Sequence, residues 1–301
     1  MLEKILKKVF GDKNSQDLKR YEPIVQEINE IFSGLEQYED EQLIARVQEI
    51  KQEIANAWNQ ESDFYDSHVS HGMKSDEEKK LWMEAFSTKI QKDKQLQVLD
   101  VGCGTGVMGL IFAEMGHTVE GIDLSEGMMD VGRKKAADMH LAMNFSSGDA
   151  EHPPFDDEKF DVVVNRHLLW TLPNPDAAIS SWFRVLKPNG TLMVIDGVWD
   201  DGSRLNTVKK KISHKIASLV EAHPHGGKSR YSNEVSSYLP NKGGTSEEKA
   251  KAYFENAGFT DITVVNLDAI TDEQRKYFRW YMKIAPKSTY YLISGKKPES
   301  T

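Results

Sequence analysis

The residues best suited to chemistry form a glycine-rich run at 98–106, which reads Val-Leu-Asp-Val-Gly-Cys-Gly-Thr-Gly. An apolar stretch leads into this run and a helix-like stretch follows it. Glycine permits left-handed backbone angles and lets a ligand approach the main chain. The free amide groups at a helix start can donate hydrogen bonds to that ligand. The pattern predicts a loop that holds a nucleotide-like ligand, with an ordinary tight turn capped by Asp100 as the structural alternative.

Two features of the run distinguish between nucleotide ligands. Val107 stands where a dinucleotide-binding fingerprint has its third glycine. Asp100, at the end of the preceding strand, would repel a pyrophosphate and attract an ammonium group. S-adenosylmethionine has an amino-acid ammonium, a sulfonium and an adenosine, and it has no phosphate. The sequence therefore favours this cofactor over a nicotinamide dinucleotide.

Two further acids follow the next expected strands. Asp123 ends the second strand, where a carboxylate can accept hydrogen bonds from both ribose hydroxyls. Asp149 follows the third strand, and we expect it to accept from the exocyclic amine of adenine. Each acid alone is more often a helix cap or a loop residue. Because open α/β sheets bind ligands at the carboxyl ends of their strands, we expect the three acids to share one site.

Short apolar stretches alternate with helix-like stretches between residues 96 and 198, which predicts an α/β fold with a parallel sheet. The expected strands are 96–101, 118–123, 143–147, 160–165, 191–196, 261–267 and 289–294. The expected helices between them are 106–116, 126–139 and 175–186. Pro188-Asn189-Gly190 predicts a turn before the fifth strand.

A set of motifs together resembles one enzyme family. These are Asp100–Gly106, Gly121–Ser125 with Met128 and Met129, Gly148–Ala150 before Pro154, Phe160–Val164, and Val185–Gly190. The set closely resembles the class I S-adenosylmethionine-dependent methyltransferases, in their ubiquinone/menaquinone methyltransferase-like, small-molecule branch. The resemblance covers about residues 56–295.

The resemblance implies a doubly wound, Rossmann-like sheet of seven mostly parallel strands, in the order 3-2-1-4-5-7-6 with the last strand antiparallel. It implies S-adenosylmethionine as cofactor and methyl transfer to O, N, S or C of a small molecule. The implied cofactor-binding residues are Tyr65, Asp100, Gly102, Cys103, Gly104, Asp123, Leu124, Met128, Asp149, Ala150 and Asn165.

The fourth strand ends in Asn165-Arg166-His167, and in this family that tip lies beside the transferred methyl. The ordinary pKa of histidine is near 6.5, so His167 is the candidate general base. Packing against the cofactor, or positioning of Asn165, is the alternative role. The expected substrate-binding residues are Arg166, Trp170, Trp199 and Tyr231, with ion pairing of the arginine and lid packing of the aromatic residues as alternatives. His223 and His225 lack a nearby carboxylate or cysteine, so no metal site is expected.

The chain is expected to divide into a helical N-terminal extension, 1–54, and a methyltransferase domain, 55–298. A polar insertion at about 199–245 is expected to cover the substrate pocket. Residues 1–14 predict a short basic amphipathic helix. Residues 1–54 resemble the N-terminal segment of SecA translocation ATPases but carry no Walker motif, so no motor activity is implied. Docking to a membrane or a protein is one interpretation, and a helical cap over the substrate side is the other.

Composition excludes several classes of protein. The chain has 301 residues, with 38 Lys and Arg against 47 Asp and Glu, a formal net charge of -9 that disfavours general nucleic-acid binding. Cys103 is the single cysteine, so no internal disulfide can form. Without a long apolar run or a signal peptide, a cytoplasmic location is expected.

The alternatives to methyl transfer are a cofactor-binding docking or regulatory protein and a non-methylating enzyme with the same cofactor.

Overall fold

The computed structural model describes residues 40–68, 71–91, 93–199, 202–221 and 230–299. Contacts divide the chain into two units, Met1–Lys51 and Gln52–Thr301. Helix α3 (Asp40–Tyr65) begins in the first unit and ends in the second. The expected basic helix at 1–14 lies outside the described residues, and the expected boundary after residue 54 stays a prediction.

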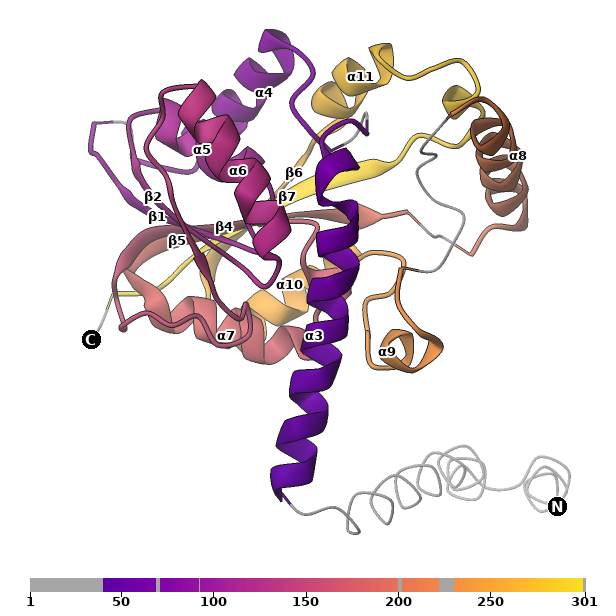
Figure 1. Cartoon of the computed structure of the whole chain (residues 1–301). Coiled ribbons are helices and arrows are strands. Elements are labelled where there is room, and N and C mark those ends of the chain that lie inside the picture. The colour runs from indigo at the N-terminus through magenta and orange to yellow at the C-terminus, as the bar shows by residue number, and fades with distance from the viewer. Residues whose placement is uncertain (1–39, 69–70, 92, 200–201, 222–229, 300–301) are drawn as a thin grey trace, which may run out of the picture. The chain divides into compact units, whose positions relative to one another are not determined.

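The second unit is built on one seven-stranded sheet (Figure 1). Its strands are β1 (Gln97–Val101), β2 (Thr118–Asp123), β3 (Asn144–Ser147), β4 (Phe160–Arg166), β5 (Leu186–Val198), β6 (Thr260–Asn266) and β7 (Thr289–Lys296). The spatial order is β3-β2-β1-β4-β5-β7-β6, and β7 runs antiparallel to both of its neighbours. The predicted fold class and strand order are therefore confirmed.

Helices cover both faces of the sheet because its strands are apolar on both sides. Val98 of β1 joins a cluster with Phe86 of α4 (Asp76–Ser87) and Phe112 of α5 (Val107–Glu114), together with side chains of α11 (Asp268–Lys276). Leu99 of β1 faces the opposite way, toward Trp182 of α7 (Pro175–Val185) and toward α10 (Glu247–Asn256). Helix α6 (Glu126–Asp138) packs on β2 and β3. Side-chain alternation along β1 thus assigns the two layers.

Strand β5 begins earlier than the expected residue 191, and the difference has a local cause. The pairing of β4 with β5 jumps from Phe160 with Leu186 to Val162 with Thr191. Asn189 has a φ of +64° in this bulge. Its N–H still donates to the Lys297 carbonyl at 2.9 Å. Because this bond continues the pairing, the predicted turn is a bulge inside one long strand.

The segment after β5 contains α8 (Arg204–Val220) and α9 (Asn233–Ser237). Two 3-10 turns, η1 (Leu169–Thr171) and η2 (Met282–Ile284), follow β4 and α11. Within the described ranges, no helix combines the length and the apolar character that crossing a bilayer requires.

Candidate functional site

The loop after β1 depends on glycine for both its backbone angles and its packing. Gly102, Gly104 and Gly106 have φ values of +62°, +53° and +73°. A Cβ on Gly102 would lie 2.6 Å from Cδ1 of Leu168, and one on Gly106 would lie 2.8 Å from Cζ of Phe145. A Cβ on Gly104 would lie 3.2 Å from Cε of Met128. These angles and contacts require glycine at the three positions, and we call the loop that they form the glycine cradle.

Asp123 connects this loop to the end of β2. Its Oδ2 accepts from the Gly104 N–H at 2.8 Å, and its Oδ1 accepts from the Ser125 N–H at 2.8 Å. Burial raises the pKa of Asp123, while the backbone amides act in the opposite direction. A carboxylate oxygen can accept two hydrogen bonds, so each oxygen retains capacity for a ribose hydroxyl.

Asp100 lies beneath the same loop and is buried. Its Oδ2 accepts from the Gly109 N–H at 2.8 Å, which ties β1 to α5. Desolvation raises the pKa of this carboxyl to about 7, against the opposing effects of the Gly109 hydrogen bond and Arg166. Cys103 beside it is also buried, and the pKa of its thiol is raised well above the ordinary value, so a reactive thiolate is disfavoured. Binding of an ammonium group by Asp100 stays a prediction.

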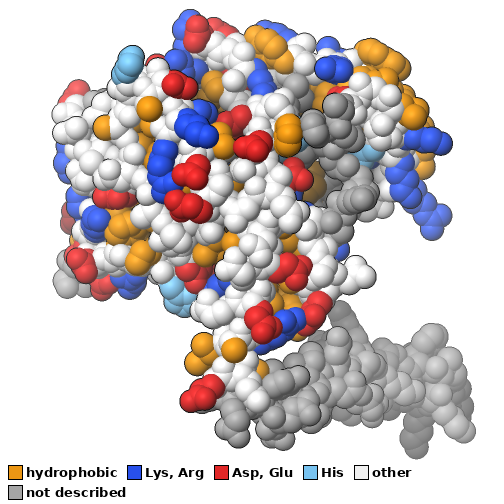
Figure 2. Space-filling view, in the orientation of Figure 1, with side chains coloured by type: hydrophobic (Ala, Val, Ile, Leu, Met, Phe, Trp, Pro, Cys, Tyr) orange, Lys and Arg blue, Asp and Glu red, His pale blue; other side chains and the backbone are white. Residues whose placement is uncertain are grey.

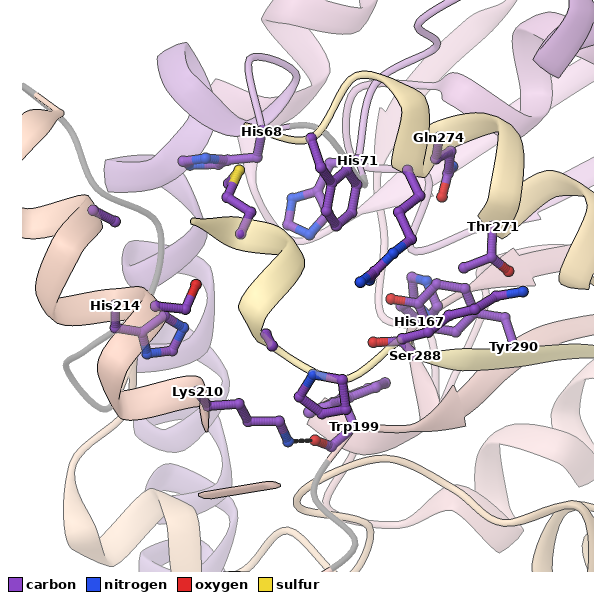
Figure 3. A pocket seen from close by; sticks show the side chains of 18 of the residues that line it. His68, His71, His167, Trp199, Lys210, His214, Thr271, Gln274, Ser288 and Tyr290 are labelled. Carbon is purple, nitrogen blue, oxygen red and sulfur yellow. Dashed lines mark hydrogen bonds between the residues drawn. The ribbon is translucent and has the colours of Figure 1, made fainter. Parts of the chain in front are cut away.

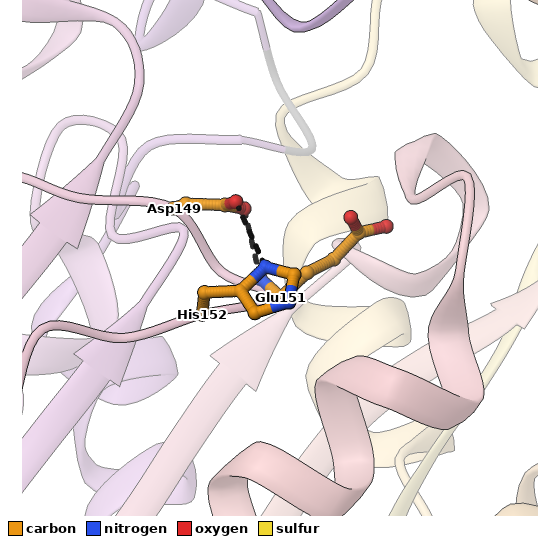
Figure 4. A group of neighbouring side chains, drawn as sticks. All are labelled: Asp149, Glu151 and His152. Atoms are coloured by element: carbon orange, nitrogen blue, oxygen red, sulfur yellow. Dashed lines mark hydrogen bonds and ion pairs between the residues drawn. The ribbon is translucent and has the colours of Figure 1, made fainter. Parts of the chain in front are cut away.

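The loop after β3 is held by its own hydrogen bonds (Figure 4). Oδ1 of Asp149 accepts from the Glu151 N–H at 2.9 Å, and Oδ2 lies 3.2 Å from Nδ1 of His152. Ala150 is buried, and its carbonyl accepts from Nε1–H of Trp182 at 2.8 Å. The ligand atoms of Asp149, Glu151 and His152 lie within 4.8 Å of one another, but these bonds account for the group as a self-capped turn.

Asn165 has an unusual environment at the end of β4. Its side chain is fully buried, yet neither the amide nitrogen nor the amide oxygen has a hydrogen-bond partner among the described residues. Buried amides in proteins are nearly always paired. A bound ligand with donor and acceptor groups would satisfy both atoms. With the glycine cradle and the spare capacity of Asp123, this orphaned amide fits an adenosine-containing, amino-acid-bearing cofactor.

The C-terminal part of α3 is fastened to these loops. Oδ1 of Asn59 accepts from Oγ–H of Ser125 at 2.7 Å and from the Gly127 N–H at 3.0 Å. Oγ1–H of Thr105 donates to Asp66 at 2.8 Å. Tyr65 follows on the same helix and stacks on the ring of His71, with 4.3 Å between centroids. Sequence reasoning assigned no role to Asn59 or Asp66, since their spacing from the glycine motif carries no signal.

A cavity of about 370 Å³ lies next to the end of β4 (Figure 3). Four of the expected site residues line it, namely Tyr65, His167, Trp170 and Trp199, together with Trp58 and Tyr290.

The two remaining expected substrate residues lie outside that lining. Tyr231 packs behind Trp170, with ring centroids 5.7 Å apart, and its hydroxyl pairs with Thr171. Burial raises the pKa of Tyr231 to about 12, so this phenol stays protonated. The Arg166 guanidinium donates to the carbonyl of His71. Both residues are therefore placed to support the cavity wall.

His167 lines the cavity and has a left-handed backbone conformation, with a φ of +55°. Its ring packs 4.7 Å from that of Tyr290, and its Nδ1 is 3.9 Å from Oδ1 of Asp196. Burial lowers the pKa of His167, which leaves the ring neutral near pH 7. Asp196 is fully buried, and its Oδ2 has no hydrogen-bond partner among the described residues. The sequence signal for Asp196 was an acid near the end of the strand adjacent to β4.

The chain is similar to known methyltransferases. Residues 99–194 match the family model described as a methyltransferase domain. The ubiquinone/menaquinone biosynthesis C-methyltransferase of Haemophilus ducreyi is 32% identical over 187 residues, covering 58% of this chain and 69% of that protein. The demethylmenaquinone methyltransferase of Staphylococcus saprophyticus is 30% identical over 193 residues, covering 62% and 80%.

A solved structure extends the likeness to the fold. Phosphoethanolamine N-methyltransferase 2 of Haemonchus contortus, in complex with S-adenosylmethionine, aligns with a TM-score of 0.53 at 21% identity, over 73% of this chain and 53% of that one. The predicted family and cofactor are thus confirmed. The chain belongs to the class I S-adenosylmethionine-dependent methyltransferases, enzymes that transfer the sulfonium methyl of this cofactor to an acceptor.

Proposed function

We propose that the acceptor is a small, ring-containing molecule that binds in the cavity beside His167. The observation that carries this proposal is the lining of the cavity, which includes the neutral His167 ring and the indoles of Trp58, Trp170 and Trp199. Flat apolar walls favour aromatic or other ring-shaped ligands. The names of the bacterial relatives, which refer to ubiquinone and menaquinone biosynthesis, agree with an acceptor of this kind.

The residues of this chain divide the work of binding the cofactor, which supplies an electrophilic methyl group when bound. Asp123 holds the ribose, and Asp149 and Ala150 border the adenine. The amides of Gly102–Gly104 and the Asp100 carboxyl receive the amino-acid end. Leu124 and Met128 pack beside the ribose and the glycine loop, and the orphaned amide of Asn165 completes the site.

The acceptor side needs alignment and, for a protonated nucleophile, a base. His167 accepts that proton in this proposal, and Asp196 orients its ring. Tyr65 and Trp58 pack edge to face, with centroids 5.8 Å apart, and exclude water from the methyl end. Trp170 and Trp199 contact the acceptor, while Tyr231 and Arg166 hold the wall behind it.

The proposed location of the protein is the cytoplasm. Docking to a membrane or a protein through residues 1–14 is a separate proposal.

The experiment uses S-adenosylmethionine with a labelled methyl group and an extract of small metabolites, followed by mass identification of labelled products. We expect a labelled ring-containing product from the wild-type protein and at least tenfold less of it from Asp123→Ala when the cofactor is below saturation. A folded protein that binds the cofactor but labels no compound below protein size would contradict the proposal. A labelled protein or nucleic acid would contradict it equally.

A further inference from the structure

Helix α8 has one side toward the cavity and one side toward solvent. Lys210, Ser213, His214 and Ala217 line the cavity. On the outer side, Leu205 is 63% exposed, Val208 52% and Leu219 78%, and Ile212 and Val220 are exposed as well. At about 100° per residue Leu205, Val208, Ile212 and Leu219 fall within about 60° of one another and form one stripe, on the side of the helix away from the cavity. A contiguous apolar stripe on a surface helix indicates an interaction site.

Basic side chains flank this stripe. Lys209 lies along one edge, and Lys211, Lys215 and Arg204 lie along the other, all exposed. The helix contains no Asp or Glu, although the whole chain has a formal net charge of -9. Figure 2 shows orange apolar and blue basic side chains together where α8 meets solvent. The helix is therefore cationic and amphipathic toward the outside of the protein.

The turn next to α8 extends the same surface. Helix α8 packs against η2, and the Tyr281 hydroxyl donates to Glu221 just after the end of α8. In this turn Trp280 is 70% exposed, and Tyr277, Arg279 and Lys283 are exposed too. Tryptophan and tyrosine have an apolar ring with a polar group, which suits the boundary between lipid and water.

We propose that α8 and the turn at 277–283, together called the α8 face, dock on the surface of an anionic lipid bilayer. Its apolar stripe would enter the acyl boundary while the long lysine side chains reach the negative headgroups. Charge argues against two other partners for the α8 face. In a dimer through this face, Lys209, Lys211 and Lys215 of the two copies would repel one another. Residues 1–14 carry four lysines, which the basic residues of α8 would also repel.

Docking would place a wall of the cavity at the lipid surface, because the inner side of α8 lines that cavity. An acceptor dissolved in the bilayer would then reach the cavity without crossing bulk water. The inference goes beyond the proposed function and does not depend on it, since lipid binding is measured without cofactor or turnover.

The test is sedimentation of the full-length protein with vesicles of equal parts phosphatidylglycerol and phosphatidylcholine. We expect binding that weakens with salt and is lost with pure phosphatidylcholine. The triple variant Lys209→Gln, Lys211→Gln, Lys215→Gln should lower the partition coefficient on the order of a hundredfold, since each basic residue near an anionic surface contributes about fivefold. The pair Val208→Ser, Leu219→Ser should lower it at least tenfold, given the apolar area withdrawn from lipid.

Matched controls are Lys251→Gln on α10 and Val264→Ser on β6, both exposed and outside the α8 face, which should bind like the wild type. Unchanged cofactor affinity shows that each variant is folded. Wild-type binding by both α8 variants would overturn the proposal and assign lipid binding to another region such as residues 1–14. Absence of vesicle binding by the wild type would overturn the proposal too. If the wild type does not bind vesicles but forms a dimer, and Leu205→Glu dissociates this dimer, then the α8 face is an interface between two copies of the chain.

Discussion

His167 adopts a backbone conformation that few residues other than glycine adopt, and it does so directly after the end of β4. The N–H of His167 donates to the Ile195 carbonyl at 2.8 Å, which holds this conformation. Its Nδ1 is within a small ring rotation of the buried Asp196 carboxylate. A hydrogen bond there would fix the tautomer with Nε2 unprotonated. The arrangement therefore suits a role for His167 as a neutral base whose ring Asp196 orients.

Replacing His167 with Asn tests that role. If His167 is the base, turnover should fall roughly 10²–10⁴-fold with cofactor affinity nearly unchanged. The wild-type rate should rise with pH through the lowered histidine pKa, because the neutral ring is the active form. The variant should lose this rise. Asp196→Asn should shift the profile and spare cofactor binding. Steady-state rates against pH at saturating cofactor measure both, and an unchanged profile in His167→Asn would end the assignment.

Asp123 is expected to provide most of the ribose binding. Asp123→Ala removes two charge-assisted hydrogen bonds, each about 1.5–3 kcal/mol before water compensates. Cofactor affinity measured by calorimetry should fall at least tenfold. Asp130→Ala, an exposed acid on α6, is the matched control and should bind normally. Equal dissociation constants for a folded Asp123→Ala protein and the wild type would remove Asp123 from the site.

Asp100 should make stability depend on pH. The pKa of this buried carboxyl rises from its ordinary value of 3.8 to about 7 on folding, so the folded state holds the proton more tightly. The contribution of Asp100 to the free energy of unfolding is therefore greatest below pH 4 and declines until the pH passes about 7. A pKa difference of roughly three units between the folded and unfolded states corresponds to a decline of up to about 4 kcal/mol in the free energy of unfolding. The Asp100→Asn variant should not show this decline. Urea unfolding of both proteins from pH 4 to 8, without cofactor, checks the prediction, and parallel curves would contradict it.

At the scale of elements, the end of α3 and the start of α6 are joined through Asn59. Asn59→Ala removes the bonds to Ser125 and Gly127, each about 1 kcal/mol. The free energy of unfolding should fall by about 1–2 kcal/mol, and the Gly127 amide should exchange hydrogen faster. Asn56→Ala on the same helix is the control, because Asn56 is exposed like Asn59 but accepts from Gln52 within α3 and not from α6. A loss in Asn56→Ala as large as in Asn59→Ala would show that the junction is not the cause.

At the scale of the whole molecule, ligand binding should appear as thermal stabilisation. S-adenosylmethionine and its demethylated product should raise the melting temperature, by about 2.7 kcal/mol of stability at a hundred times the dissociation constant. Nicotinamide dinucleotides should leave it unchanged, because an ionised Asp100 would repel a pyrophosphate and the third glycine is missing. A thermal shift assay with each ligand at the same concentration tests this, and stabilisation by NAD would contradict the argument for the loop.

Local patterns in the sequence were enough to predict the sheet, the cofactor and the family. Strand periodicity, the turns between strands and the left-handed glycines at 102, 104 and 106 are properties of neighbouring residues, so a single chain displays them directly. The order of strands followed because the family resemblance rests on these same local motifs. The bulge at Asn189 was misread as a turn, since the Lys297 carbonyl that keeps it in the strand lies far along the chain.

Which side chains lie together became visible only in the folded chain. Asp196 lies near His167 because β4 and β5 pair in a particular register, and Asn59 reaches Ser125 because the end of α3 lies beside the start of α6. The tertiary structure also showed which aromatic residues border the cavity and that Tyr231 packs behind Trp170 instead. These are contacts between distant residues whose geometry depends on packing, and packing is a property of the folded chain that no local pattern encodes.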